Sequence, residues 1–177
     1  MNSFSALPIG TDRTAVSEHA PDNYERMCYY NGIAGDGDCP ELIYRSNYLT
    51  TPFLKPTGGF SQTPIKAVYG IGGTPLNQVW STVGDQVRAI VKAAVPNYTS
   101  IGPARFCTFG PNGFTHNPDP AKGEGSLGPV TIWVGVPPGS TSADTAHGAS
   151  QEILALLHKH NIDDVVVEWR DAVIVSL

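Results

Sequence analysis

Two side chains in the longest loop of the sequence are of the types that acid–base chemistry uses. His116 and Asp119 lie in a stretch rich in Gly and Pro between Gly110 and Gly128, and catalytic groups are often carried on loops. An imidazole close to a carboxylate can act as a general base. Nothing in the sequence orients these two groups, so the alternative is a pair of exposed loop residues.

The second candidate site is a sheet face. Successive strand residues point to opposite faces of a sheet, so a strand over 130–136 turns Trp133 away from Ile132 and Val134. By the same alternation, a last strand separates Val165, Val167 and Trp169 from its other residues. The residues expected to gather on one face, with Cys107 as the alternative to Arg105, are Trp133, Arg105, Glu168 and Arg170.

A large aromatic side chain beside charges on an open sheet is typical of a docking surface or a shallow ligand site. This interpretation requires the face to be open. The alternative is that residues 23–64 cover it and that Trp133 belongs to the core.

Other motifs favour structural roles. Gly70 to Gly73 precede a predicted helix, but the spacing of a dinucleotide or phosphate loop is missing, which favours a tight turn. On the second predicted helix, one side carries Asp144, His147, Gln151 and His158, opposite the apolar side. We interpret this stripe as a solvated helix face, and we expect neither a metal site nor a cofactor.

The elements that would position these groups follow from hydrophobic spacing. Thr74 followed by Pro75 is typical of a helix start, and Pro96 ends that helix. Ser142 and Asn161 suit the start and the end of a second helix. Strands are expected at 65–71, 101–109, 130–136 and 164–169.

The resulting order, β-α-β-β-α-β, predicts an α+β fold of the ferredoxin-like type, with two helices on one face of a four-stranded sheet. Residues 1–22 are rich in Ser, Thr, Pro and Ala and predict a flexible arm. Residues 23–64 carry many aromatic side chains between turn formers, which indicates an irregular layer wrapped on the main fold. Residues 23–177 are then one domain.

Composition excludes several classes of function. The 177 residues are 41% hydrophobic, enough for one core, and their net charge is −5. Lys and Arg are not clustered, so nucleic-acid binding is not expected. No stretch approaches the roughly 18 apolar residues of a membrane span. Three widely spaced cysteines and the lack of a signal peptide favour a cytoplasmic protein with reduced thiols.

Three segments resemble a known family. They are Pro75-Leu76-Asn77-Gln78-Val79-Trp80, then 130–136 with Pro138-Gly139-Ser140, then 163–170. They are similar to the N-terminal region of a large family of uncharacterised proteins from mushroom-forming (basidiomycete) fungi, over about residues 40–173. Many of those proteins continue into a segment resembling the histidine motif of trypsin-like peptidases, which this sequence does not contain. The resemblance implies a fungal source and an accessory or regulatory domain, and it transfers no catalytic residue.

Two functions are expected from these observations. The first is a non-catalytic interaction or regulatory domain that binds a protein partner or a second copy of itself through the Trp133 face. The second is a small-molecule-binding protein or enzyme with a pocket between the sheet and the 110–128 loop.

Overall fold

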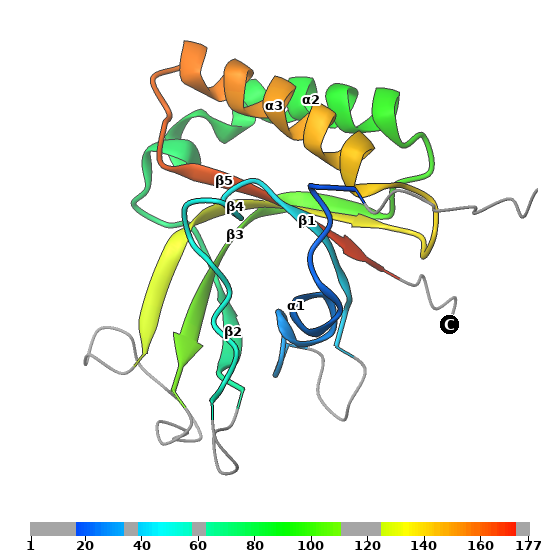
Figure 1. Ribbon diagram of the computed structural model, residues 1–177. Helices are drawn as coiled ribbons and strands as arrows, with labels where there is room; N and C mark the ends of the chain where they lie inside the picture. Colours follow the sequence, from blue (N-terminus) through cyan, green and yellow to red (C-terminus); the bar gives the residue numbers. More distant parts are fainter. Residues whose placement is uncertain (1–16, 34–38, 58–62, 111–124, 173–177) are drawn as a thin grey trace, which may run out of the picture.

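The computed structural model describes residues 17–33, 39–57, 63–110 and 125–172, which form three helices and five strands (Figure 1). This is an α+β fold, as expected. In chain order the elements are α1 (Asn23–Cys28), β1 (Leu42–Arg45), β2 (Ile65–Tyr69), α2 (Pro75–Ala94), β3 (Ser100–Phe109), β4 (Ser126–Val136), α3 (Ala143–Lys159) and β5 (Val165–Asp171).

The five strands form one mixed sheet in the order β1-β5-β4-β3-β2. β4 and β5 are parallel and are joined through α3, and every other neighbouring pair is antiparallel. α2 and α3 cover one face of the sheet (Figure 1). β2 and the adjoining ends of β3 and β4 curve away from these helices, so the opposite face of the sheet is concave.

The strand order is not the one expected of a ferredoxin-like sandwich. A split βαβ unit places another strand between the two that flank a helix, whereas β2 pairs directly with β3 and β4 directly with β5. The physical reason is the composition of β2. It contains Lys66, and its five residues are half-buried or exposed, whereas a central strand such as β4 is largely buried. β2 therefore lies at the edge.

The starts of both long helices are those that the sequence predicts. The hydroxyl of Thr74 accepts a hydrogen bond from the backbone N–H of Asn77 at 3.3 Å, and that of Ser142 accepts one from Thr145 at 3.1 Å. Asn161, just beyond α3, has a φ of 60°, in the left-handed region expected for it. Local sequence thus fixes where α2 and α3 begin and where α3 ends.

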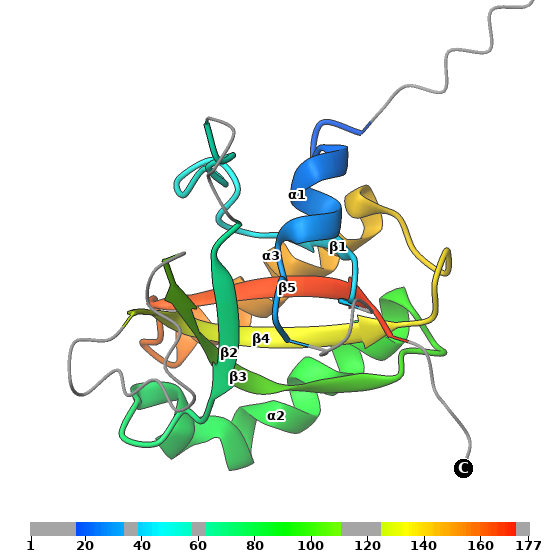
Figure 2. The ribbon, with the colours of Figure 1, turned by 90° about the horizontal axis from the view of Figure 1, so that it is seen from below.

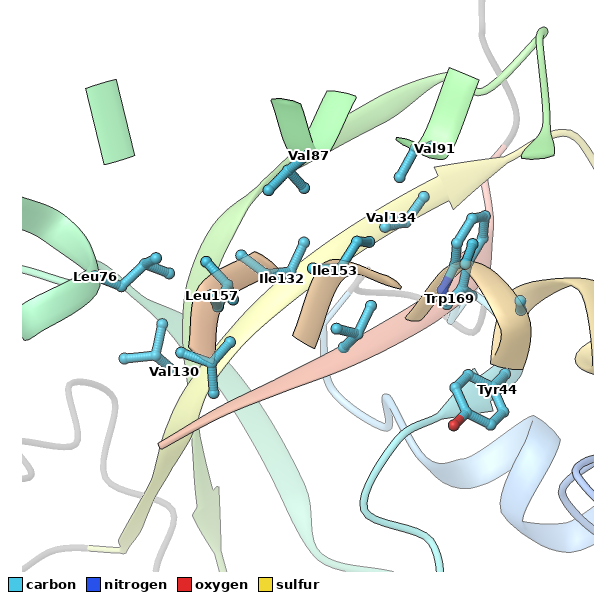
Figure 3. Packing of buried hydrophobic residues seen from close by; sticks show 14 of the residues in the cluster. Tyr44, Leu76, Val87, Val91, Val130, Ile132, Val134, Ile153, Leu157 and Trp169 are labelled. Atoms are coloured by element: carbon cyan, nitrogen blue, oxygen red, sulfur yellow. The ribbon is translucent and has the colours of Figure 1, made fainter. Parts of the chain in front are cut away.

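The main core lies between these helices and the sheet, as Figure 3 shows. Residues of β4 and β5 that alternate along the strand point into it, which confirms the predicted alternation. Fully buried side chains that meet there include Val87, Val91, Ile132, Val134, Ile153 and Leu157.

Trp169 brings a polar atom into this core. Its ring is fully buried, and its indole N–H donates to Ser150 Oγ at 2.9 Å. The Ser150 hydroxyl in turn donates to the carbonyl of Ala146 at 2.7 Å. Because the indole N–H and the Ser150 hydroxyl each donate to a partner, the large ring is buried without an unpaired donor.

The concave face is covered by the N-terminal part of the chain. Seen from below, α1 and the chain leading to β1 lie in front of the sheet, and α2 and α3 lie behind it (Figure 2). Tyr30, Leu42 and Phe106 form a second buried cluster, against which Trp133 packs. The ring centroids of Tyr30 and Trp133 are 5.7 Å apart. The described part of residues 23–64 therefore covers this face, as in the alternative to an open docking surface.

The described end of the expected N-terminal arm also contacts the fold. Ser17 Oγ donates to Asp144 Oδ1 at 2.6 Å, and the rings of His19 and His147 stack with their centroids 3.8 Å apart. Both partners belong to α3. Residues 1–16, the rest of the arm, lie outside the described residues.

Among the described residues, no helix combines the length and the apolar character needed to cross a membrane.

Gly32 sets how closely the N-terminal layer approaches β2. Its φ is +89°, and a Cβ at this position would lie 2.0 Å from Cγ2 of Ile65. We expect Gly32→Ala to lower the free energy of unfolding by about 3 kcal/mol, because the left-handed backbone and the overpacking each carry a cost. Urea denaturation measures this loss.

Gly73→Ala is the matched control, since Gly73 has a φ of +77° and nothing within 4 Å of the added Cβ. We expect Gly73→Ala to lower the free energy of unfolding by about 1 kcal/mol, because only the left-handed backbone carries a cost there. Equal losses in the two variants would show that the approach of Gly32 to Ile65 does not constrain the layer.

Candidate functional site

A buried carboxylate lies at the centre of the concave face. Glu168 of β5 is 2% exposed, and its neighbours Val167 and Trp169 point into the core on the helix side. Its carboxylate oxygens accept hydrogen bonds from the hydroxyls of Tyr29, at 2.6 Å, and Tyr30, at 2.8 Å. An ionised carboxylate is a pure acceptor, so two phenolic donors match it.

The two tyrosines are buried with this carboxylate. Burial, reinforced by the negative charge of Glu168, raises the pKa of Tyr29 and that of Tyr30 well above the usual value. Both phenols therefore stay protonated at neutral pH and remain donors to Glu168.

An amine lies next to this cluster. Lys66 of β2 places its Nζ 3.0 Å from the centroid of the Tyr29 ring, an arrangement that attracts a cation to the ring face. Burial lowers the pKa of Lys66 to about 8, although the charge of Glu168 acts in the opposite direction. No carboxylate of the described residues forms an ion pair with this amine.

Arg45 forms another wall of the site. Its guanidinium, 3% exposed, pairs with the carboxylate of Glu25 in α1. It also donates to Asn47 Oδ1 at 3.1 Å and to the carbonyl of Thr51 at 2.7 Å. Because Arg45 ends β1, these bonds connect α1, β1 and the segment that follows β1.

A pocket of about 290 Å³ lies between the concave face and the 51–54 segment, and we call it the Lys66 pocket. Phe53 and Phe106 contribute to its mainly apolar walls. Its volume is near the lower end of the range for small-molecule sites. The polar residues that line it are Tyr29, Arg45, Asn47, Thr51, Lys66, Thr108, Thr131 and Glu168.

A larger hollow of about 450 Å³, more open to solvent, lies between α1, β1 and the start of α3. Its charged rim is self-paired, since Arg26 Nε lies 3.5 Å from Glu41 Oε2 and both side chains are about half-exposed. Exposed ion pairs of this kind contribute little. Because the partly buried amine of Lys66 and the buried carboxylate of Glu168 line the other pocket, we regard the Lys66 pocket as the site.

The structure brings together three of the residues predicted for the sheet face. Trp133 lies beside Glu168 in the parallel register of β4 and β5. The guanidinium carbon of Arg170 is 4.0 Å from the centroid of the Trp133 ring. Glu168 alone of the three lines the Lys66 pocket.

The remaining predicted residues do not join them. Arg105 alternates along β3 with Phe106 and so points to the other face, where its guanidinium donates to the carbonyl of Gly128 at 2.9 and 2.7 Å. His116 and Asp119 lie outside the described residues.

The helix stripe predicted to be solvated is covered at one position. His147 stacks on His19, and its Nδ1 lies 3.0 Å from the hydroxyl of Tyr44. The reason is the contact of Ser17 and His19 with α3, which helical spacing cannot indicate. The described residues contain no group of three side chains that could hold a metal ion.

Sequence reasoning missed Lys66, Arg45 and the roles of the two tyrosines. The available signals were a lysine inside a short, imperfectly alternating strand and adjacent tyrosines in the aromatic N-terminal layer. Neither signal identifies a partner, because Tyr30 and Glu168 are separated by 138 positions.

Comparison with known proteins gave no match to a family model, a curated protein or a solved structure.

The lowered pKa of Lys66 predicts a specific pH dependence of stability. In the unfolded chain the pKa of this amine is about 10.4. Between about pH 8 and pH 10 the unfolded state therefore binds more protons than the folded state, and the free energy of unfolding rises with pH. We expect a rise of about 2 to 3 kcal/mol attributable to Lys66, obtained by urea denaturation of the wild type and of Lys66→Met across this window.

The free energy of unfolding of Lys66→Met, measured against pH, is the baseline, because it includes the contribution of every titrating group except Lys66. Above about pH 10 the raised pKa values of Tyr29 and Tyr30 reverse the slope in both proteins, because the unfolded phenols then lose protons first. Parallel curves for the wild type and the variant below pH 10 would exclude a buried, pKa-shifted lysine.

Proposed function

We propose that this protein binds a small, largely apolar molecule in the Lys66 pocket. The observation that carries the proposal is the position of the partly buried amine of Lys66 and the buried carboxylate of Glu168 at one apolar pocket. Pockets with apolar walls and a few convergent polar groups are typical ligand sites. Ionisable groups with shifted pKa values cluster at such sites.

The energetic argument concerns the amine. Burying a charged group without a matched partner is costly. Arg45 avoids that cost through Glu25, Asn47 and Thr51, whereas Lys66 has only the face of the Tyr29 ring in direct contact. The partly buried amine of Lys66, beside the Tyr29 ring at the pocket wall, is available to a bound molecule, which supports a role in ligand binding.

This is the second of the two functions expected from the sequence, but different residues form the wall of the pocket. The pocket was expected beneath the 110–128 loop, and its described lining includes Gly128 but is otherwise built mainly by the strands and by residues 51–54. The fungal family resemblance and the cytoplasmic location remain predictions, and the proposal does not depend on them.

An interaction through the Trp133 face stays a prediction, and we do not propose it because Tyr30 and Phe106 pack against that ring and leave it only partly exposed. We therefore expect Trp133→Ala to lower the free energy of unfolding by about 3 kcal/mol, as for other truncated core aromatics. We expect its oligomeric state in analytical ultracentrifugation to equal that of the wild type. A wild-type dimer that Trp133→Ala converts into a folded monomer would restore the interaction hypothesis.

Ligand binding is tested with hexanol, an uncharged probe with an apolar chain and one hydroxyl. In an NMR titration of the ¹⁵N-labelled full chain, we expect concentration-dependent shifts at Lys66, Thr108 and Thr131. Thr108→Phe should abolish them, since the larger ring fills the pocket and phenylalanine suits a strand. Ser100→Phe is the matched control, because Ser100 is an exposed residue of the same strand outside the pocket.

Shifts that are absent in the wild type, or that are equal in Thr108→Phe and Ser100→Phe, would contradict binding in the Lys66 pocket.

A further inference from the structure

The charges around the Lys66 pocket restrict the ligand it accepts. Arg45 and Glu25 form one ion pair. The carboxylate of Glu168, which accepts from two phenols, supplies the negative charge that compensates Lys66. These are the charged groups that face Lys66 from α1, β1 and β5. The site is therefore close to electrically neutral before any ligand enters.

An anionic ligand would add an uncompensated charge beside Glu168. Bringing a second carboxylate into a buried site next to an existing one is strongly unfavourable. A cationic ligand meets the same difficulty beside Lys66 and Arg45. The ligand favoured by this arrangement is uncharged.

Lys66 differs from the other lysines of the described chain in what its amine contacts. Lys55 pairs with Asp22 at 2.8 Å and is half-exposed, and Lys92 and Lys159 are exposed on the helices. The Lys66 amine instead lines an apolar pocket and rests on a ring face. A desolvated amine of this kind is the usual setting for a lysine that attacks a carbonyl carbon.

We propose that Lys66 forms a Schiff base with small, uncharged, apolar aldehydes or ketones that enter the pocket. This inference rests on the proposed function, because it concerns the same pocket and names the chemical class of its ligand.

The reaction is balanced within the site. The lone pair of Nζ attacks the carbonyl carbon and forms the C–N bond, while the π bond of the carbonyl breaks and its electron pair goes to oxygen. One amine proton passes to that oxygen and gives a carbinolamine. The C–O bond then breaks, the oxygen leaves as water with both former amine protons, and the C=N bond forms. No electrons are gained or lost, so no oxidant or reductant is required. When the imine is protonated, its positive charge replaces that of the lysine and remains compensated by Glu168.

Reductive trapping with hexanal tests the proposal on the full chain. Sodium cyanoborohydride reduces an imine to a stable secondary amine, and peptide mapping by mass spectrometry locates it. At pH 7 we expect Lys66 to be labelled at least about tenfold faster than Lys92 and Lys159, because its lowered pKa leaves more of the neutral amine. Lys92 and Lys159 are internal controls in the same molecule, so this comparison needs no variant.

The pH profile gives a second measurement. The labelling rate of Lys66 should level off above about pH 8, whereas that of the exposed lysines should continue to rise towards pH 10, approximately. Lys66→Arg keeps a positive charge and removes the nucleophile, so it should lose labelling at this position while Lys92 and Lys159 are labelled at their wild-type rates.

The outcomes separate the two proposals. Labelling of Lys66 no faster than that of Lys92 and Lys159, with hexanol binding intact, overturns the Schiff base and leaves small-molecule binding in place. Absence of both hexanol shifts and preferential labelling overturns both proposals. Fast labelling of Lys66 that is unchanged in Thr108→Phe would show a reactive amine outside the pocket and would also contradict the inference.

Discussion

The burial of one carboxylate constrains the whole concave side of this protein. Glu168 lies on β5, between β1 and β4, and is only 2% exposed. A buried charge must be hydrogen-bonded or compensated. Tyr29 and Tyr30 provide the hydrogen bonds. Because both follow α1 directly, satisfying Glu168 brings the N-terminal segment onto the sheet. The second core around Tyr30, Leu42 and Phe106 depends on that placement.

β5 illustrates how adjacent residues of one strand organise two different layers. Trp169 points to the helices and satisfies its indole N–H through Ser150 of α3. Glu168 points to the N-terminal layer and satisfies its carboxylate through tyrosines. The sheet is therefore covered on both faces, on one side by an apolar helical layer and on the other by an aromatic layer that includes charges.

The edge position of β2 connects the fold to the proposed site. In a ferredoxin-like order this strand would lie between two others and Lys66 would be surrounded by the sheet. At the edge, beside the curved end of β3, β2 instead turns Lys66 towards Tyr29 and leaves room for a pocket. The departure from the expected topology and the chemistry proposed for the site thus have the same cause.

Local signals in the sequence predict the helices and strands of the second half of the chain. Thr74, Ser142 and Asn161 marked helix ends through local hydrogen bonds and backbone preferences, and the apolar alternation of β4 and β5 assigned their faces. It also placed Trp133, Glu168 and Arg170 on a common face, because strand alternation is local information.

Contacts between distant segments determine which strands are neighbours, what covers the concave face and which residues form the pocket. The position of a strand in a sheet depends on how apolar it is relative to the other strands. β2 lies at the edge because β4 is more apolar and takes a central position. The contacts of Glu168 with Tyr29 and Tyr30, and of Lys66 with Tyr29, join residues far apart in the chain. Local periodicity carries no signal for such pairs, since each side chain alone fits an ordinary exposed position and its partner lies elsewhere in the sequence.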